Sequence, residues 1–449
     1  MSLIDKIHEA GVVGAGGAGF PTDKKLNCKV EYFIINGLEC EPLLQSDKYI
    51  MRNKSDEIVK AAQEIGKLVE ASNIVISLKK EYEKEIEALK KSIDKLNSNV
   101  TLYLSDVFYP AGDEQTLVYE VTGRTIPPAG IPLNVGAVVS NVSTVFNIYE
   151  AIEDKPVMYK YVTVIGEIRI PSIIKVPIGT PVLQCIESCG GAKLDDYAVI
   201  MGGPMMGKRV LKKDLESRFI TKTDGAIIVL SSEHYLFNRE KITIEHMKKQ
   251  AKSACIQCHY CTDMCPRNLI GHPMHPHKIM RNVAFGIENE EALKETLICC
   301  ECGVCEMYAC PMGLSPKRIN VYFKNELRKK GIKWVNDKKR FEASLIRDYR
   351  KVPTKRLIRR LHLNDYIGQV LKEGEEIIPS KVEIPLKQNI GAPAEAIVSL
   401  GDKVFKGQKI GEVKEGNMGA NIHASIDGVV SDIKGGRIVI KLMKPEVIV

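Results

Sequence analysis

Nine of the thirteen cysteines in this 449-residue sequence lie in two short runs, CIQCHYCTDMCP and CCECGVCEMYACP. Each run holds three cysteines separated by two residues and a further cysteine followed by proline. Three such thiolates can bind three irons of one 4Fe-4S cube, and the cysteine before proline binds the other cube in two-cluster proteins. The spacing predicts two 4Fe-4S clusters, the first held by Cys255, Cys258, Cys261 and Cys310 and the second by Cys299, Cys302, Cys305 and Cys265.

These runs leave two alternatives open. Paired C-x-x-C motifs also build tetrahedral zinc sites, but the third evenly spaced cysteine and the Cys-Pro pair in each run favour clusters. Cys300 adjoins Cys299 and competes for its role, although the even spacing favours Cys299. The remaining cysteines lack ligand spacing and are expected to be small buried hydrophobes: Cys28, Cys40, Cys185 and Cys189.

A glycine-rich segment near the amino terminus, GAGGAGFPT, places Gly14, Gly16 and Gly19 in the pattern of a dinucleotide-binding loop. The residues before it look helical and Pro21 follows it, so the strand and long helix that flank the loop in a plain Rossmann domain are missing. Residues without side chains still allow backbone N–H groups to approach a phosphate. The segment predicts a phosphate site, with an ordinary glycine turn as the alternative.

Two acidic segments accompany the loop. Glu39 and Glu41 follow the apolar run EYFIIN, at the carboxyl end of a predicted parallel strand, where ligands of such sheets collect. Asp113 and Glu114 stand in AGDEQT at the predicted start of a helix. Carboxylates there either cap the helix or contact a ligand, and capping alone explains Asp113 adequately.

The chain is too long for a single hydrophobic core, and the pattern of apolar and polar residues along it predicts a multidomain α/β and α+β protein. Alternating apolar and amphipathic runs predict a parallel sheet with crossover helices, followed by Gly- and Pro-punctuated short strands, helical cysteine-bearing segments, a basic stretch and a final set of short strands. We expect a parallel-sheet domain at 1–155, a small α+β domain at 156–240, a two-cluster ferredoxin domain at 241–330, a basic helical connector at 331–378 and a small β domain at 379–449.

The formal charge of +8 is concentrated between Lys317 and Arg360, which favours an acidic redox partner or an anionic cofactor over nucleic acid. The amino terminus lacks the pattern of a secretory signal, and no apolar run reaches the length of a membrane span. We therefore expect a cytoplasmic protein without a transmembrane segment, whose cysteines serve metal or catalysis rather than disulfides.

Four segments carry a family resemblance: GAGGAGFPT, INGLECEP, GDEQT and VVSNVSTVFNI. In this order they resemble the FMN-binding domain of the NADH-oxidising subunit of respiratory complex I. The next module resembles the SLBB β-grasp domain, and the whole order resembles the RnfC family of the Rnf complex. That family usually carries its barrel-sandwich domain at the amino terminus. Its position here at the carboxyl end is similar to the PduS-type cobalamin reductases of bacterial microcompartments.

The resemblance implies an FMN site and an NADH site. It places Phe20 and Glu41 near the nicotinamide nucleotide, while Ala15 and Leu38 stand where complex I has Arg and Asp, which weakens the expectation for NADH more than for FMN. The FMN site implied by the resemblance consists of Gly14, Gly16, Gly17, Gly19 and Lys25 around the phosphate and Asn36, Glu39, Asp113, Glu114, Asn141 and Thr144 around the ring and ribityl chain.

The implied activity is electron transfer from NADH through FMN and two 4Fe-4S clusters to a corrinoid, with no catalytic acid or base required of the protein. The alternatives are an electron-transfer subunit of an Rnf-like or partner-enzyme complex that does not oxidise NADH itself, and a scaffold with degenerate sites. Asn417 occupies the position of the modifiable lysine in carrier domains, so a docking or structural role is expected there. The expected partners are NADH, a corrinoid or corrinoid-handling enzyme, a redox protein and a microcompartment shell.

Overall fold

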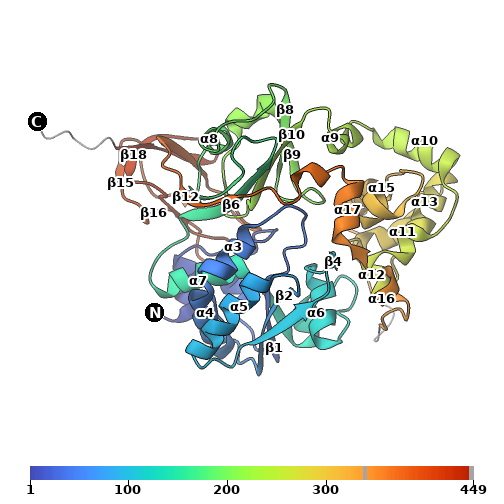
Figure 1. Cartoon of the computed structure of the whole chain (residues 1–449), viewed down its shortest axis with the longest axis horizontal. Coiled ribbons are helices and arrows are strands. Elements are labelled where there is room, and N and C mark those ends of the chain that lie inside the picture. Colours follow the sequence, from blue (N-terminus) through green and yellow to red (C-terminus); the bar gives the residue numbers. More distant parts are fainter. Residues whose placement is uncertain (337–340, 444–449) are drawn as a thin grey trace, which may run out of the picture.

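The computed structural model describes residues 1–336 and 341–443, which form three modules built on sheets and one helical module (Figure 1). The first module contains a parallel sheet in the order β3-β2-β1-β5. Buried apolar side chains on both faces of its central strands explain why the sequence shows continuous apolar runs there. Its strands are β1 (Tyr32–Asn36), β2 (Asn73–Lys79), β3 (Thr101–Ser105) and β5 (Ala137–Asn141).

Helices cover both faces of this sheet. Phe33 and Ile35 of β1 share a core with the helices of one face, whereas Ile34 packs with Leu117 on the other face. The first face carries α1 (Leu3–Glu9), α3 (Ser46–Asn53), α4 (Ser55–Leu68), α5 (Glu83–Lys95) and α7 (Val142–Ile152). The second face carries α6 (Glu114–Thr122), and short elements complete the module: α2 (Thr22–Leu26), β4 (Phe108–Tyr109) and η1 (Pro132–Val135).

The second module is a mixed six-stranded sheet in the order β12-β7-β6-β10-β8-β9. Helix α8 (Val182–Ser188) packs on it through Cys185 and Ile186. Its strands are β6 (Tyr159–Gly166), β7 (Ser172–Pro177), β8 (Tyr197–Met201), β9 (Lys208–Leu211), β10 (Ala226–Ser231) and β12 (Lys372–Glu376), with η2 (Lys212–Ser217) after β9.

The segment expected to be a helical connector is helical only in part. Strand β12 lies inside it and pairs in parallel with β7, and β11 (Val352–Pro353) pairs with β4 of the first module. The segment therefore joins two modules by backbone pairing. Its helical parts are α16 (Arg347–Arg350), α17 (Thr354–Arg360) and η5 (Asn364–Tyr366).

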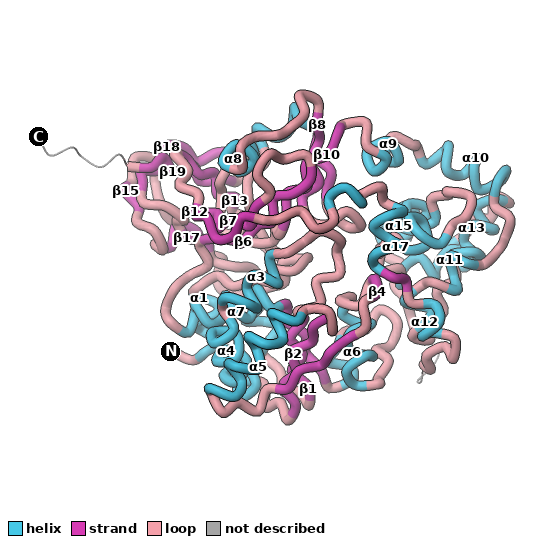
Figure 2. Tube along the Cα trace, in the orientation of Figure 1, coloured by secondary structure: helices cyan, strands magenta, loops and turns pink. Residues whose placement is uncertain are grey.

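The cysteine-bearing module is helical, as Figure 2 shows. Its core combines apolar side chains such as Ile279 and Phe323 with Cys265 and Cys310. Its elements are α9 (Tyr235–Glu240), α10 (Ile244–Ala254), α11 (Tyr260–Asp263), α12 (Pro266–Leu269), α13 (Pro276–Ala284), α14 (Glu290–Leu293), η3 (Lys294–Ile298), η4 (Cys305–Ala309) and α15 (Pro316–Lys329).

The last module has two small sheets, β13-β19-β18-β15 and β14-β16-β17, and packs against the first module. Ile384 and Ile422 belong to the same buried cluster as Ile7 of α1. Buried Lys222 links three modules, because its Nζ donates to the backbone oxygens of Gly11 at 2.7 Å and Asn421 at 2.8 Å. The strands are β13 (Lys381–Pro385), β14 (Glu395–Ala396), β15 (Lys403–Val404), β16 (Lys409–Glu412), β17 (Ile422–His423), β18 (Gly428–Lys434) and β19 (Arg437–Leu442).

The expected fold class, multidomain α/β and α+β, is confirmed. Within residues 1–336 and 341–443, no helix has both the length and the apolar character to cross a membrane.

Candidate functional site

The glycine loop, residues 14–19, is held at the carboxyl end of the parallel sheet by bonds to the Ala15 peptide. The Ala15 N–H donates to Thr144 Oγ1 at 2.9 Å, and the Ala15 oxygen accepts from Lys160 Nζ at 3.0 Å. Burial lowers the pKa of Lys160. Helix α7 and strand β6 therefore fix the loop, and Thr144 does so through its hydroxyl group.

Gly16, Gly17 and Ala18 offer three successive backbone N–H groups that find no acceptor within the described part of the chain. All three residues line a cavity. A Cβ on Gly16 would lie 2.9 Å from Asn141 Cγ, whereas a Cβ on Gly17 would meet no atom within 4 Å. Gly16 must lack a side chain because Asn141 lies against it, and the free N–H groups suit an anion such as a phosphate.

The cavity has two lobes that meet at the glycine loop. The first lobe, about 570 Å³, lies within the first module and is bordered on one side by Ile390 of the last module. The second lobe, about 520 Å³, lies between the first and second modules and reaches Cys302. Asn36 and Asn141 border both lobes. Each lobe has the size of an ordinary small-molecule site.

The two asparagines end neighbouring strands, and protein groups already occupy their side chains. Asn36 donates to the Gly112 oxygen at 2.9 Å and accepts from the Leu38 N–H at 3.0 Å. Asn141 caps α7 and donates to Asp47 at 2.8 Å. These bonds orient both side chains at the border of the lobes.

The first lobe combines charged and apolar walls. Lys25 Nζ pairs with Glu114 at 2.9 Å, and both side chains are only partly exposed. Phe20 lines the same lobe. The Ile390 N–H donates to the Gly19 oxygen at 3.1 Å, so the last module forms part of this wall.

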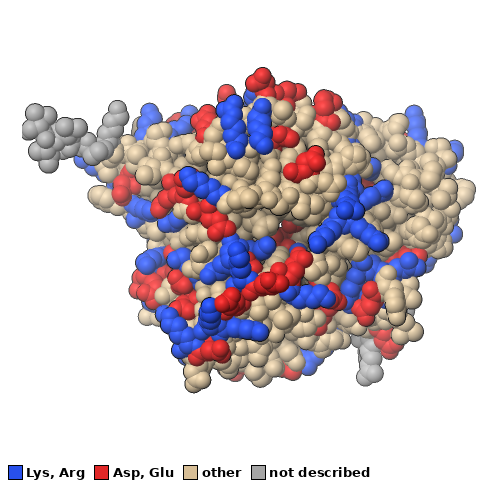
Figure 3. All heavy atoms as spheres, in the orientation of Figure 1, with Lys and Arg blue, Asp and Glu red and all other residues tan. Residues whose placement is uncertain are grey.

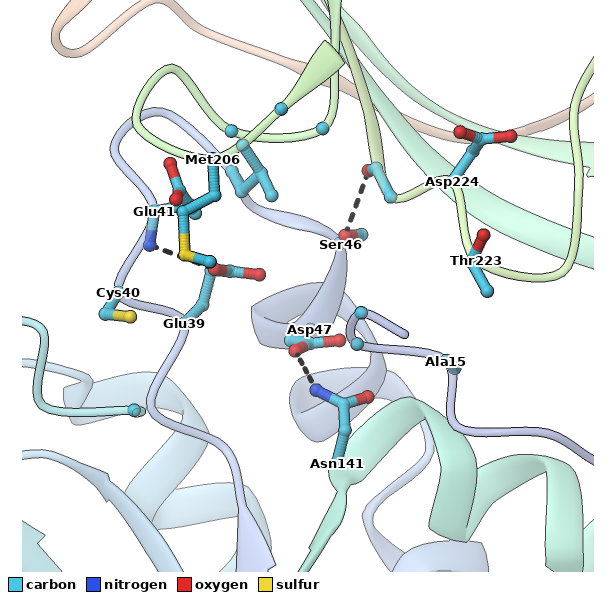
Figure 4. A pocket seen from close by; sticks show the side chains of 18 of the residues that line it. Ala15, Glu39, Cys40, Glu41, Ser46, Asp47, Asn141, Met206, Thr223 and Asp224 are labelled. Carbon is cyan, nitrogen blue, oxygen red and sulfur yellow. Dashed lines mark hydrogen bonds between the residues drawn. The ribbon is translucent and has the colours of Figure 1, made fainter. Parts of the chain in front are cut away.

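Acidic side chains gather in the second lobe (Figure 4). Burial, with the nearby charges of Asp47 and Glu41, raises the pKa of Glu39 to about 8. Burial also raises the pKa of Glu41 to about 7. The Glu41 Oε2 atom accepts from the Met205 N–H at 2.9 Å, while the buried Oε1 atom has no partner in the described residues. The raised pKa favours the protonated form of Glu39, which can donate a hydrogen bond.

The structure separates two residues that the resemblance places together. Phe20 lines the first lobe and Glu41 lines the second. A nicotinamide nucleotide that touches both would have to cross the border at Asn36 and Asn141.

Asp113 has partners that the sequence does not indicate. It caps α6 by accepting from the Thr116 N–H at 3.1 Å, as its position predicts. Its two carboxylate oxygens also accept from Arg267 of the helical module, at 2.5 and 2.9 Å. The Arg267 charge and these bonds outweigh burial and lower the pKa of Asp113. Asp113 borders the second lobe rather than the first, which contains Glu114.

The structure brings the predicted metal ligands together in two groups. Cys255, Cys258, Cys261 and Cys310 line one small cavity. The second group lies next to this cavity. The charges of Cys299, Cys265 and Cys261 lie close enough to Cys305 to raise its pKa. The charges of Cys265 and Cys305 raise the pKa of Cys302 in the same way. Each group takes one cysteine from the other run. In the described ranges no three His, Cys, Asp or Glu side chains are arranged to hold a single metal ion.

Cys300 faces the second lobe beside Cys302. A hydrogen bond from Cys302 and the Arg267 charge lower the pKa of Cys300 to about 7, although burial acts in the opposite direction. Cys300 is therefore a thiol between the cavity and the second cysteine group.

Buried Tyr109 connects the cavity to that group, because its hydroxyl donates to the Cys302 oxygen at 2.8 Å. Sequence reasoning missed Tyr109, Arg267 and Lys160. Arg267 follows the Cys-Pro pair directly, and that adjacency is the single signal in the sequence that points to it. Asn417 lies exposed in the turn between β16 and β17, where the sequence placed it.

Models of four domain families match the chain in the order of its modules. They describe a Nuo51 FMN-binding domain over residues 7–150, an SLBB domain over 161–209, a 4Fe-4S dicluster domain over 254–315 and an RnfC barrel sandwich hybrid domain over 372–449. The chain thus carries an FMN-binding domain and a domain for two 4Fe-4S clusters, as expected from the sequence.

Two relatives match over nearly the whole length, and a third matches over part of it. Cobalamin reductase PduS of Salmonella typhimurium is 41% identical over 436 residues, 96% of this chain and 94% of that protein. PduS of Citrobacter freundii is 39% identical over 440 residues, 96% of this chain and 95% of that protein. A component of the proton-translocating ferredoxin:NAD(+) oxidoreductase complex from Clostridium ljungdahlii is 36% identical over 273 residues, 60% of this chain and 56% of that protein. The chain belongs to the PduS family of cobalamin reductases.

Proposed function

We propose that this protein transfers electrons from NADH to a corrinoid through FMN and two 4Fe-4S clusters. The observation that carries the proposal is that two cavities adjoin at the glycine loop with its free N–H groups, and that the second of them reaches Cys302. The PduS relatives are named as cobalamin reductases, which supports a corrinoid as the acceptor.

The residues present fit the flavin. The N–H groups of Gly16 and Gly17, with Lys25 in the same lobe, would bind the phosphate. FMN, when bound, can accept a hydride as a two-electron unit and release the electrons singly. Protonated Glu39 can donate a hydrogen bond to a ligand in the second lobe, and Asn36 marks the border that a ligand spanning both lobes must cross.

The cysteine groups fit two clusters that pass single electrons. We assign Cys255, Cys258, Cys261 and Cys310 to the first cluster and Cys299, Cys302, Cys305 and Cys265 to the second. The second group lies nearer the cavity because Cys302 forms part of its wall. One NADH supplies two electrons and releases one proton, which balances the reduction of two cob(III)alamin molecules to cob(II)alamin.

The test is anaerobic stopped-flow reduction of the bound flavin by NADH, followed by the absorbance change of added cob(III)alamin. We expect flavin bleaching, then cob(II)alamin formation, with a Michaelis constant for NADH in the upper part of the usual range of roughly 1 μM to 1 mM, because Ala15 and Leu38 replace nucleotide-binding side chains of complex I. Glu41→Ala should slow the first step without releasing FMN. A Glu41 variant that reduces as fast as the wild type contradicts the role of Glu41.

One observation favours a second candidate function. Phe20 and Glu41 lie in different lobes, so the pair does not form one nicotinamide pocket. The alternative is an electron-transfer subunit of an Rnf-like or partner-enzyme complex that does not oxidise NADH itself. Flavin that stays oxidised in excess NADH but is reduced by a reduced redox protein would establish this alternative and exclude the reductase.

The same proposal includes location in the cytoplasm and association with a bacterial microcompartment, which the family resemblance implies. None of the thirteen cysteines, all of which lie in the described residues, forms a disulfide, which suits a reducing compartment. Purified microcompartments that lack the protein, with all of it recovered in the free cytoplasmic fraction, would exclude the association with the shell.

A further inference from the structure

Helix α17 covers the second cysteine group from outside. Its buried face carries Leu357 and Ile358, which share a core with Cys302 and Val304. The helix also packs against η4, which begins at Cys305. One helix thickness, about 10 Å, therefore separates the outer surface of α17 from this group.

The outer face of α17 is strongly basic. It carries Lys355, Arg356, Arg359 and Arg360, all exposed, at the spacing of one side of a helix. None of the four pairs with a carboxylate in the residues that the structure describes. In Figure 3 blue side chains gather over the position that α17 occupies in Figure 1. We call these four side chains the basic face.

Helix stability does not account for the basic face. Arg359 and Arg360 lie in the last turn, where positive charge favours the helix dipole. Lys355 and Arg356 lie in the first turn, where positive charge opposes the dipole. The nearest carboxylate on α16, Asp348, is engaged by Lys351 at 3.0 Å and gives no compensation. The two dipole effects offset each other, but Lys355 with Arg359 and Arg356 with Arg360 are like charges at i and i+4, which destabilise a helix. Such a cost is expected of a surface kept for an external anion.

We propose that the basic face is the docking site of a small acidic redox protein that exchanges electrons with the cluster held by Cys265, Cys299, Cys302 and Cys305. The inference rests on the proposed electron path through that cluster. Charge complementarity selects the partner, because four unpaired cations on one exposed face steer an acidic protein to dock there. Docking at this face brings the partner within about one helix thickness of the cluster.

The experiment uses flavodoxin as the acidic probe and full-length protein with both clusters. Arg356→Glu with Arg359→Glu reverses two charges of the basic face. Lys84→Glu with Lys90→Glu is the matched control, because these exposed lysines of α5 make no ion pair within the described residues and the net charge changes equally. Arg356→Gln with Arg359→Gln tests a smaller change if the reversal impairs folding. Iron content and NADH reduction of the flavin, measured without flavodoxin, report the proposed function separately.

We expect the association rate with flavodoxin to fall at least about tenfold in the α17 reversal and to stay near wild type in the control. We also expect the wild-type rate to fall as ionic strength rises, with a smaller dependence in the α17 variants. Equal rates in the wild type and the α17 variants, or an equal loss in the control, would overturn the proposal. So would binding of duplex DNA or anionic lipid vesicles through α17 in a protein that does not bind flavodoxin.

Discussion

Replacing Arg267 by methionine leaves the Asp113 carboxylate without its charged partner. The two side chains are 9% and 16% exposed, and two bonds join them. Removing one partner of a buried ion pair typically costs about 3–5 kcal/mol, because the remaining charge is uncompensated. For 449 residues that unfold as one unit, an unfolding entropy of about 0.9 kcal/mol/K converts this cost into a fall in Tm of about 3–5 °C. A smaller unfolding unit gives a larger fall.

A double-mutant cycle separates the ion pair from other effects. Asp113→Asn keeps an N-cap for α6, since asparagine is a good capping residue, and removes the charge. We expect the combined variant, Arg267→Met with Asp113→Asn, to recover more than half of the stability lost by Arg267→Met alone. Arg124→Met is the control, because the Arg124–Glu31 pair is 41% and 44% exposed and exposed pairs contribute less than about 1 kcal/mol.

The assay is thermal unfolding by circular dichroism at several pH values. Arg267 lowers the pKa of Asp113, so the stability from this carboxylate is present above its ordinary pKa and is lost as the pH falls through the lowered value. The difference in Tm between the wild type and Arg267→Met should therefore shrink below about pH 4. Additive single effects in the cycle, or a difference in Tm that does not change with pH, would refute the reasoning.

Three further predictions concern the cofactor sites. Anaerobically reconstituted protein should hold about eight irons and eight sulfides by iron and sulfide analysis. Cys302→Ser should lose one cluster, whereas Cys300→Ser should keep both. Loss of iron in the Cys300 variant would show that Cys300 is a ligand. Gly16→Val should abolish FMN binding in equilibrium dialysis and leave the iron content unchanged, because the new side chain meets Asn141; retained FMN would argue against this site. Because the pKa of Glu39 is raised, this carboxyl group contributes stability that is fully present below its ordinary pKa and is lost as the pH rises to about 8. Glu39→Gln should therefore flatten the decline in Tm between pH 5 and 8. An unchanged slope would count against a raised pKa of Glu39.

Features with local signals could be predicted from the sequence. Cluster ligands follow one another at fixed spacing, and the alternating apolar runs of the first module produce buried parallel strands. Strand β12 could not be predicted, because KEGEE is exposed at every position and forms by backbone pairing with β7 rather than by burial. Contacts between modules could not be predicted from the sequence either. Arg267 and Asp113 are 154 residues apart, and no motif or spacing in either segment indicates that the two residues are partners.

The same distinction between local sequence signals and contacts between modules applies to the candidate site. The sequence points to the glycine loop through a contiguous motif and to Asn36 and Asn141 only through the family resemblance, whereas Ile390 reaches the loop from the far end of the chain without any such signal. A residue that lines a cavity from another module has no periodicity or spacing that indicates it. Lys160 is similar, since it belongs to a strand yet bonds to the loop.

The packing of the last module on the first bears on the order in which the modules of such a protein can be encoded in its gene. The module shares a buried cluster with α1, and Lys222 donates to the oxygens of Gly11, just after α1, and of Asn421 in the last module. A segment that lies beside the amino terminus in space can be encoded at either end of the gene with the same contacts, which is the geometry that circular permutation requires. In this chain the contacts of the last module with the first therefore do not depend on which end of the gene encodes the module.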